Sequence, residues 1–150
     1  MGTQLGMAAA PLPAAAPCPC GRTDRKLTNK GQPLAYAACC QPWHKGLHAG
    51  QPAPDAEALM RSRYSAFVLG LADYLRATWH PSTCPPDLAL EPGVKWLGLA
   101  VRGHHATDAT HATVEFVARS RVGGQGQRLH EVSRFVREDG RWWYVDGDLA

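Results

Sequence analysis

The second half of the chain alternates apolar and polar residues with a period of two, which is typical of β-strands. Four such stretches follow one another, at residues 94–102, 110–121, 127–138 and 141–147. Between the last two lies Asp139-Gly140, a dipeptide that favours the two-residue turn of a β-hairpin. A glycine-rich loop at residues 123–126 joins the second and third stretches. The pattern therefore predicts a four-stranded antiparallel sheet.

Helical periodicity precedes the strands. From Asp55 onward, apolar side chains recur every three or four residues and form one stripe, at Ala56, Met60, Tyr64, Phe67 and Leu71. Gly70 offers a stop, and a second helix is expected to follow it. That helix should end before His80, because the next residue, Pro81, biases His80 toward extended backbone. Helices followed by an antiparallel sheet predict an α+β fold.

One charged residue interrupts the apolar stripe. Arg63 falls between Leu59 and Phe67 on the helical wheel, whereas Arg61 points away from the stripe. An unpaired buried guanidinium is costly, so Arg63 needs either a partner or a wet cavity. The sequence leaves open whether Arg63 forms a structural ion pair or binds a ligand.

The Asp139-Gly140 turn fixes which residues of the last two strands share a face, and places Phe135 opposite Tyr144. One face then carries His130, Val132, Arg134, Val136, Trp143 and Val145. The other carries Leu129, Glu131, Ser133, Phe135, Trp142, Tyr144 and Asp146. Neither face is cleanly polar, which fits a curved sheet with one side packed on helices and the other partly covered by a neighbour. It also fits polar groups set into an apolar concavity, the usual composition of a small-molecule pocket. The candidate pocket residues are Arg63, Tyr64, Trp79, His80, His130 and Arg134.

The composition is that of an ordinary globular protein. The chain has 150 residues, of which 45% are hydrophobic and 19% charged, enough for one domain or a small domain with an appendage. Its apolar runs are short and interrupted by proline or glycine, which argues against a membrane span. A net charge of +3 is too small to predict nucleic-acid binding by itself.

Residues 1–17 are rich in alanine and proline and contain no lysine or arginine, the first basic residue being Arg22. A secretory signal needs a basic start and an unbroken apolar stretch, and these residues have neither. We therefore expect a disordered leader over residues 1–17 and a cytoplasmic protein whose thiols stay reduced.

Cysteines are concentrated after this leader. Four of the five lie close together in the sequence, at Cys18, Cys20, Cys39 and Cys40. In a reducing compartment such clustering favours metal binding over disulfides, and four thiolates suit tetrahedral Zn²⁺ in a structural role. Buried apolar cysteines are the alternative, and His44 or His48 could complete a set of three cysteines and one histidine. Cys84 stands apart and is expected to lie in a loop.

Cys18-Pro-Cys-Gly21, followed by Tyr-Ala-Ala-Cys-Cys at residues 36–40, resembles the SEC-C motif. This motif is a small zinc-binding element that is also found at the C-terminus of the bacterial translocase ATPase SecA. The chain is also similar to the YchJ-type family of bacterial proteins, through residues 56–69, 77–81 and 129–136. Together the two similarities cover nearly everything after residue 17.

The resemblance implies two parts. Residues 51–150 would form a nuclear transport factor 2-like (NTF2-like) cone, in which helices pack on a curved antiparallel sheet, and residues 18–50 would form a SEC-C-like zinc-binding segment. The sequence departs from the motif at Arg22-Thr23, where Ser-Gly is usual, and at Gln41, where a glycine is expected. Both departures concern the turns that carry the cysteines.

Two functions of different classes agree with these features. The favoured hypothesis is a binding or adaptor module with structural zinc, which reaches a protein or ribosome-associated partner through the zinc segment, as the resemblance to SecA implies. The basic residues of this segment could also meet an acidic surface or RNA; they are Arg22, Arg25, Lys26 and Lys30. The alternative is a small-molecule enzyme of isomerase, dehydratase or hydrolase type that uses the cone pocket.

The enzyme hypothesis needs a titratable group that works near neutral pH. The candidates are His80, His130, Glu131 and Asp73, with Arg63 or Arg134 to hold an anion. The sequence does not show that any two of them converge, so it assigns no catalytic residue.

Overall fold

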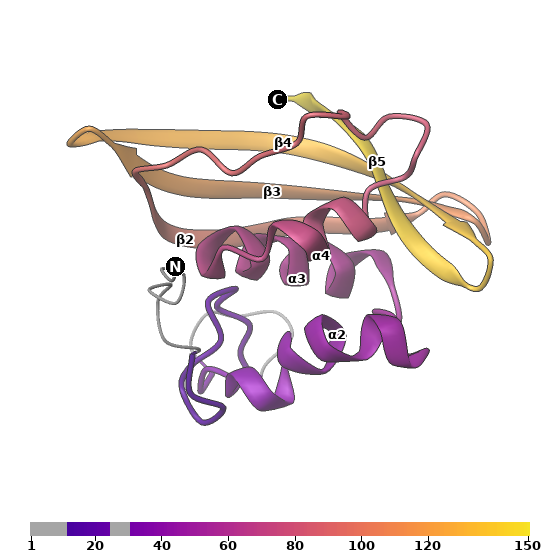
Figure 1. Cartoon of the computed structure of the whole chain (residues 1–150), viewed down its shortest axis with the longest axis horizontal. Helices are drawn as coiled ribbons and strands as arrows, with labels where there is room; N and C mark the ends of the chain where they lie inside the picture. The colour runs from indigo at the N-terminus through magenta and orange to yellow at the C-terminus, as the bar shows by residue number, and fades with distance from the viewer. Residues whose placement is uncertain (1–11, 25–30) are drawn as a thin grey trace, which may run out of the picture.

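Four long strands form one antiparallel sheet in the computed structural model, which describes residues 12–24 and 31–150 (Figure 1). In chain order, which is also their order in the sheet, they are β2 (Val94–Ala106), β3 (His111–Val122), β4 (Gln125–Glu138) and β5 (Arg141–Leu149). The four predicted strands are confirmed. The turn between the last two is confirmed as well, because Asp139 and Gly140 have the positive φ angles, 54° and 78°, that a type I′ turn requires.

A β-bulge in β5 changes the predicted faces of the sheet. Phe135 pairs with Tyr144 as expected, but Arg134 pairs with Asp146, so Val145 is an extra residue between the two pairs. Asp146 therefore lies on the face of Arg134 and not on that of Phe135, and the prediction for Asp146 was wrong. An alternating pattern does not reveal a bulge, because the extra residue is compatible with either face.

Helix α3 (Ala56–Leu69) crosses one face of the sheet, and α4 (Ala72–Ala77) follows it (Figure 1). The Asp55 side chain caps α3 by accepting a hydrogen bond from the Ala58 N–H at 2.7 Å, and Gly70, with a φ of 75°, ends the helix. Both predicted helices are confirmed. Among the described residues, no helix has the length and apolar character needed to cross a membrane.

The N-terminal segment covers the side of α3 that faces away from the sheet, so α3 lies between two layers (Figure 1). This segment contains the short helices η1 (Tyr36–Ala38), α2 (Gln41–Gly46) and η2 (Leu47–Ala49). Arg61, which the periodicity placed away from the core, has a side chain that is only 14% exposed. The single apolar stripe in the sequence thus underestimates how much of α3 is buried.

Part of the expected leader is tied to this segment. The Tyr36 N–H donates to the Ala16 carbonyl at 2.8 Å, and the Ala37 N–H donates to the Ala14 carbonyl at 2.9 Å. Ala14 and Ala16 thus have backbone partners in the N-terminal segment, and the disordered leader over residues 1–17 stays a prediction. The rest of the expected leader, residues 1–11, lies outside the described residues.

One buried cluster joins all three layers. It includes Phe135 from β4, Leu59 from α3 and the four clustered cysteines of the N-terminal segment. This cluster contains residues from both sides of residue 50, so it does not separate a zinc segment from a cone there. The predicted boundary at residue 50 stays a prediction.

Candidate metal centre and cavity

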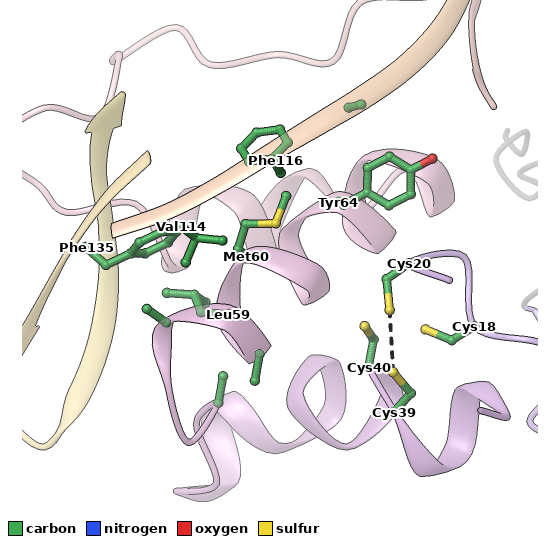
Figure 2. Packing of buried hydrophobic residues seen from close by; sticks show 14 of the residues in the cluster. Cys18, Cys20, Cys39, Cys40, Leu59, Met60, Tyr64, Val114, Phe116 and Phe135 are labelled. Atoms are coloured by element: carbon green, nitrogen blue, oxygen red, sulfur yellow. Dashed lines mark hydrogen bonds between the residues drawn. The ribbon is translucent and has the colours of Figure 1, made fainter. Parts of the chain in front are cut away.

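Four cysteine sulfurs meet where the N-terminal segment packs on α3 (Figure 2). Their Sγ atoms all lie within 4.8 Å of one another, and those of Cys20 and Cys39 are 3.5 Å apart. All four side chains are buried, and Cys20 has no exposed surface. The structure thus brings together the four cysteines that were selected from the sequence, Cys18, Cys20, Cys39 and Cys40.

Two tight turns present these sulfurs. The Cys18 carbonyl accepts a hydrogen bond from the Gly21 N–H at 3.1 Å, and Gly21 has a φ of 75°, in the left-handed region that favours glycine. Cys40 precedes α2, and its carbonyl accepts the N–H groups of Trp43 and His44 at 3.1 and 3.0 Å. Both turns form despite the departures from the SEC-C motif.

The electrostatics of the cluster call for a cation. Hydrogen bonding to Cys18 and Cys20, together with burial, raises the pKa of Cys40 far above its usual range, while hydrogen bonds from the other three thiols lower the pKa of Cys18. Buried thiolates side by side repel one another, so without a cation the four cannot all ionise. A metal ion removes this obstacle, because a coordinating thiol loses its proton outright. The cluster could therefore hold a metal ion.

Helix α3 contributes polar groups to the surroundings of the sulfurs. The Ser65 hydroxyl donates to the Cys40 Sγ at 3.3 Å and lies 3.6 Å from the Cys18 Sγ. One turn earlier, the Arg61 Nη1 donates to the Cys20 carbonyl at 3.2 Å and lies 3.9 Å from the Cys20 Sγ. These donors would partly balance the net negative charge of a complex between one divalent metal ion and four thiolates.

A cavity of about 160 Å³ lies on the opposite side of α3, against the inner face of the sheet. Its wall is mostly aromatic and aliphatic; it consists of Met60, Arg63, Tyr64, Phe67, Trp79, Trp96, Phe116, Ala118, Leu129, Glu131, Ser133, Phe135 and Tyr144. We call this space the cone cavity. A mostly apolar concavity with a few polar groups is the usual makeup of a small-molecule site.

Arg63 lies in the wall of the cone cavity without a carboxylate partner among the described residues. Its Nη1 donates to the Leu75 carbonyl and to the Thr78 Oγ1, both at 2.8 Å. Its guanidinium carbon lies 4.4 Å from the ring centroid of Tyr144 and 5.2 Å from that of Trp79. Burial lowers the pKa of Arg63 to about 10. The structure thus does not support the structural ion pair; a carbonyl, a hydroxyl and two aromatic rings surround the charge instead.

Glu131 is the acidic group of the cone cavity. Its Oε2 accepts hydrogen bonds from the Ser133 hydroxyl at 2.5 Å and from the Tyr144 hydroxyl at 3.3 Å. All three side chains belong to the face of Phe135, so the sequence-predicted register already grouped them. The sequence analysis selected Glu131 only as an acid–base candidate, and it missed Ser133, Tyr144 and the aromatic residues of β2 and β3.

Known proteins share both the cysteine cluster region and the cone. The middle NTF2-like domain of YchJ matches residues 55–147. A UPF0225 protein of Polaromonas naphthalenivorans is 63% identical over 134 residues, which cover 88% of this chain and 96% of the relative. The chain belongs to the YchJ-like UPF0225 family. Another UPF0225 protein, from Cupriavidus metallidurans, is 59% identical and covers 89% of each chain.

Two solved structures resemble this family member along most of its length. One is the crystal structure of a SEC-C motif containing protein from Psychrobacter arcticus, with a TM-score of 0.72 and 35% identity, covering 91% of this chain and 84% of the other. The other is the solution structure of a SEC-C motif containing protein from Rhodopseudomonas palustris, with a TM-score of 0.72 and 34% identity, covering 90% and 99%. The family resemblance and the α+β, NTF2-like fold expected from the sequence are therefore confirmed.

The six pocket candidates from the sequence of this UPF0225 family member fall into two groups. Arg63, Tyr64 and Trp79 line the cone cavity. The other three lie outside it and bind carboxylates; they are His80 on Glu138 at 2.9 Å, His130 on Glu115 at 2.7 Å, and Arg134 on Asp146 and Asp148, both at 2.6 Å. His130 and Arg134 point away from the helices because the even-numbered residues of β4 face the outer side of the sheet.

The remaining candidates lie away from both sites. Asp73 is exposed and pairs with Arg76 at 3.0 Å, and Cys84 lies in a loop, outside the cysteine cluster. Of the basic residues in the N-terminal segment, Arg22 lies 3.9 Å from Glu57. The others, at positions 25, 26 and 30, lie outside the described residues.

His44 is held by other partners than the sulfurs. Its Nδ1 lies 2.6 Å from the Tyr36 hydroxyl, and its Nε2 lies 2.8 Å from the Ser62 carbonyl. Since the carbonyl can only accept, Nε2 carries the proton and Nδ1 accepts from Tyr36. Burial lowers the pKa of His44, which favours this neutral form. With both ring nitrogens occupied, His44 is not placed as a metal ligand, and His48 is exposed.

We expect His44→Gln to keep the metal and to lose stability. The substitution disturbs two hydrogen bonds in a partly buried site, which costs roughly 1–2 kcal/mol of unfolding free energy. Metal content of the purified variant, measured by mass spectrometry, and urea unfolding would check both parts. A variant that has lost its metal would show that His44 is a ligand after all.

Proposed function

We propose that this chain is a binding protein in which a structural Zn²⁺ fixes the N-terminal segment on α3 and the cone cavity takes a small molecule. Cys18, Cys20, Cys39 and Cys40 would hold the ion. Four thiolates leave no open position on tetrahedral zinc, so the metal would supply folding free energy and no catalysis. With Zn–S bonds of about 2.3 Å, sulfur atoms are spaced by about 3.8 Å. The observed spread, within 4.8 Å, supports this fit.

The observation that carries the binding function is the makeup of the cone cavity. Its volume of about 160 Å³ is close to that of apolar protein cavities, about 150 Å³, that take up one benzene molecule. Two charged side chains, Arg63 and Glu131, stand in an otherwise largely aromatic wall. A cone that served only as a scaffold would gain stability by filling this space with apolar side chains.

Filling the cone cavity tests this proposal. We expect small aromatic probes to shift the indole N–H signals of Trp79 and Trp96 in NMR titrations of the metal-loaded protein. Ala118→Leu puts a larger side chain into the cavity wall and should weaken binding of phenol at least tenfold. Val132→Leu, on the outer face of the same sheet, is the matched control and should leave binding unchanged. Absence of probe binding to the parent protein would refute the binding function.

A reaction in the cone cavity is the second candidate, and Glu131 is the observation that favours it. A carboxylate in a largely apolar cavity is suited to general acid–base chemistry of the isomerase, dehydratase or hydrolase type. Contact of the zinc segment with a protein or ribosome-associated partner, and a cytoplasmic location, stay predictions.

A further inference from the structure

We infer that the cone cavity selects a planar ring that carries an N–H or O–H donor, and that Glu131 accepts the hydrogen bond from it. The inference rests on the small-molecule function proposed above and names the class of ligand. It follows from how the Glu131 carboxylate is held, which of its oxygens is occupied, and what the neighbouring Arg63 already binds.

The Glu131 carboxylate occupies a position that the local backbone makes for it. The bulge at Val145 brings Gly147 opposite Ser133, on the inner face of the sheet. A Cβ atom on Gly147 would collide with the Glu131 carboxylate, so the missing side chain of this glycine is what gives the carboxylate its space. The backbone around Gly147 thus provides the space in which the Glu131 carboxylate lies.

Only one of the two carboxylate oxygens is engaged. The hydroxyls of Ser133 and Tyr144 both donate to Oε2. No donor from residues 12–24 or 31–150 reaches Oε1, and no cationic side chain among them forms an ion pair with Glu131. Glu131 is partly buried, and no side-chain oxygen of the described residues is both buried and without a partner, so Oε1 is accessible to water. A ligand that displaces this water is favoured if it supplies a donor in its place.

Arg63 is only partly available to an anionic ligand: its Nη1 is occupied, whereas its Nε and Nη2 bind no acceptor among the described residues. Its Nη1 is bonded to Leu75 and Thr78, and its guanidinium lies against the rings of Tyr144 and Trp79. An acid in the cavity would also be repelled by Glu131. Together these contacts favour a neutral ring with a donor over an aromatic acid.

The shape of the wall favours a flat ligand of about one ring. Two rings of α3 contact the Trp96 ring: the ring centroids of Tyr64 and Phe67 lie 5.7 and 5.6 Å from that of Trp96. Phe135 on β4 and Tyr144 on β5 form a further, edge-to-face pair with ring centroids 5.7 Å apart. Aromatic rings prefer edge-to-face or offset packing on one another, and a planar ligand can continue this arrangement.

NMR titration of the metal-loaded full chain with phenol, benzene and benzoate tests the inference. We expect phenol to bind with the highest affinity of the three. The ratio of phenol to benzene affinity should fall about tenfold in Glu131→Leu, because a hydrogen bond to a charged acceptor is lost. Glu115→Gln removes a carboxylate from the outer face of the same sheet and should keep the ratio.

Each other outcome is informative. Stronger binding of benzoate would overturn the inference and assign an anion site to Arg63. Equal affinities for phenol and benzene, or a ratio that Glu131→Leu leaves unchanged, would overturn the role of Glu131 while the binding function stands. Absence of binding by all three probes would overturn the binding function itself. If Glu131→Leu fails to fold, Glu131→Gln serves instead, and a neutral acceptor should reduce the ratio by a smaller factor.

Discussion

Replacing Cys40 with serine is expected to abolish metal binding and to unfold the N-terminal segment. Cys40 is 1% exposed, and its sulfur lies within 4.8 Å of the other three. In small zinc modules metal binding supplies about 10–16 kcal/mol of apparent folding free energy, so losing a ligand of the proposed zinc would remove a large stabilising contribution from this segment. Metal analysis of the purified variant and its thermal unfolding by circular dichroism would measure the loss.

The loss at Cys40 should also reach the cone cavity, because α3 lies between the sulfurs and the cavity wall. Cys84→Ser is the matched control: it removes a thiol outside the cluster and should leave metal content and melting temperature unchanged. A strong chelator added to the parent protein should reproduce the effect of Cys40→Ser. If Cys40→Ser retained one equivalent of metal, the four-sulfur site would be incorrect.

The regular elements were predictable from the sequence because their signals are local. The apolar period of two gave the strands, Asp139-Gly140 gave the hairpin turn, and Asp55 with Gly70 bounded the first helix. The cysteine grouping was equally accessible, since unusual residues at close spacing have few explanations.

The cone cavity was harder to predict because its wall depends on tertiary arrangement. The sequence analysis selected pocket residues by their chemical type, and so included His130 and Arg134. Both have even numbers in β4, and the even-numbered residues of this strand lie on the outer face of the sheet. The predicted alternation had already placed Glu131 and Ser133 on the same face as Phe135. Selecting polar residues from that face alone would have identified both. The bulge at Val145 has no comparable sequence signal, because nothing in the alternation marks it.

Arg61→Met is expected to weaken metal binding about 10–100-fold, the usual range for residues that surround metal ligands. Zinc with four thiolates carries a net charge of −2, and this centre is buried. The Arg61 Nη1 lies 3.9 Å from the Cys20 Sγ, and Glu57 orients the side chain by accepting from Arg61 Nε at 2.8 Å. Methionine keeps most of the packing volume and removes the positive charge, so the loss would report on electrostatics.

Competition with a chromophoric chelator measures the affinity of the parent and the variants for Zn²⁺, and Co²⁺ substitution reports the sulfur coordination by its visible spectrum. Arg61→Lys should recover part of the affinity, because lysine restores the charge but not the planar donor set that reaches the Cys20 carbonyl. Arg76→Met removes an exposed arginine from α4 and should have no effect. Equal affinities in the parent and Arg61→Met would show that Arg61 only packs between the layers. An affinity for Zn²⁺ that decreases from arginine through lysine to methionine at position 61 would instead show that α3 stabilises the metal centre by charge. The metal centre would then be coupled to the cone cavity, because α3 also lines that cavity.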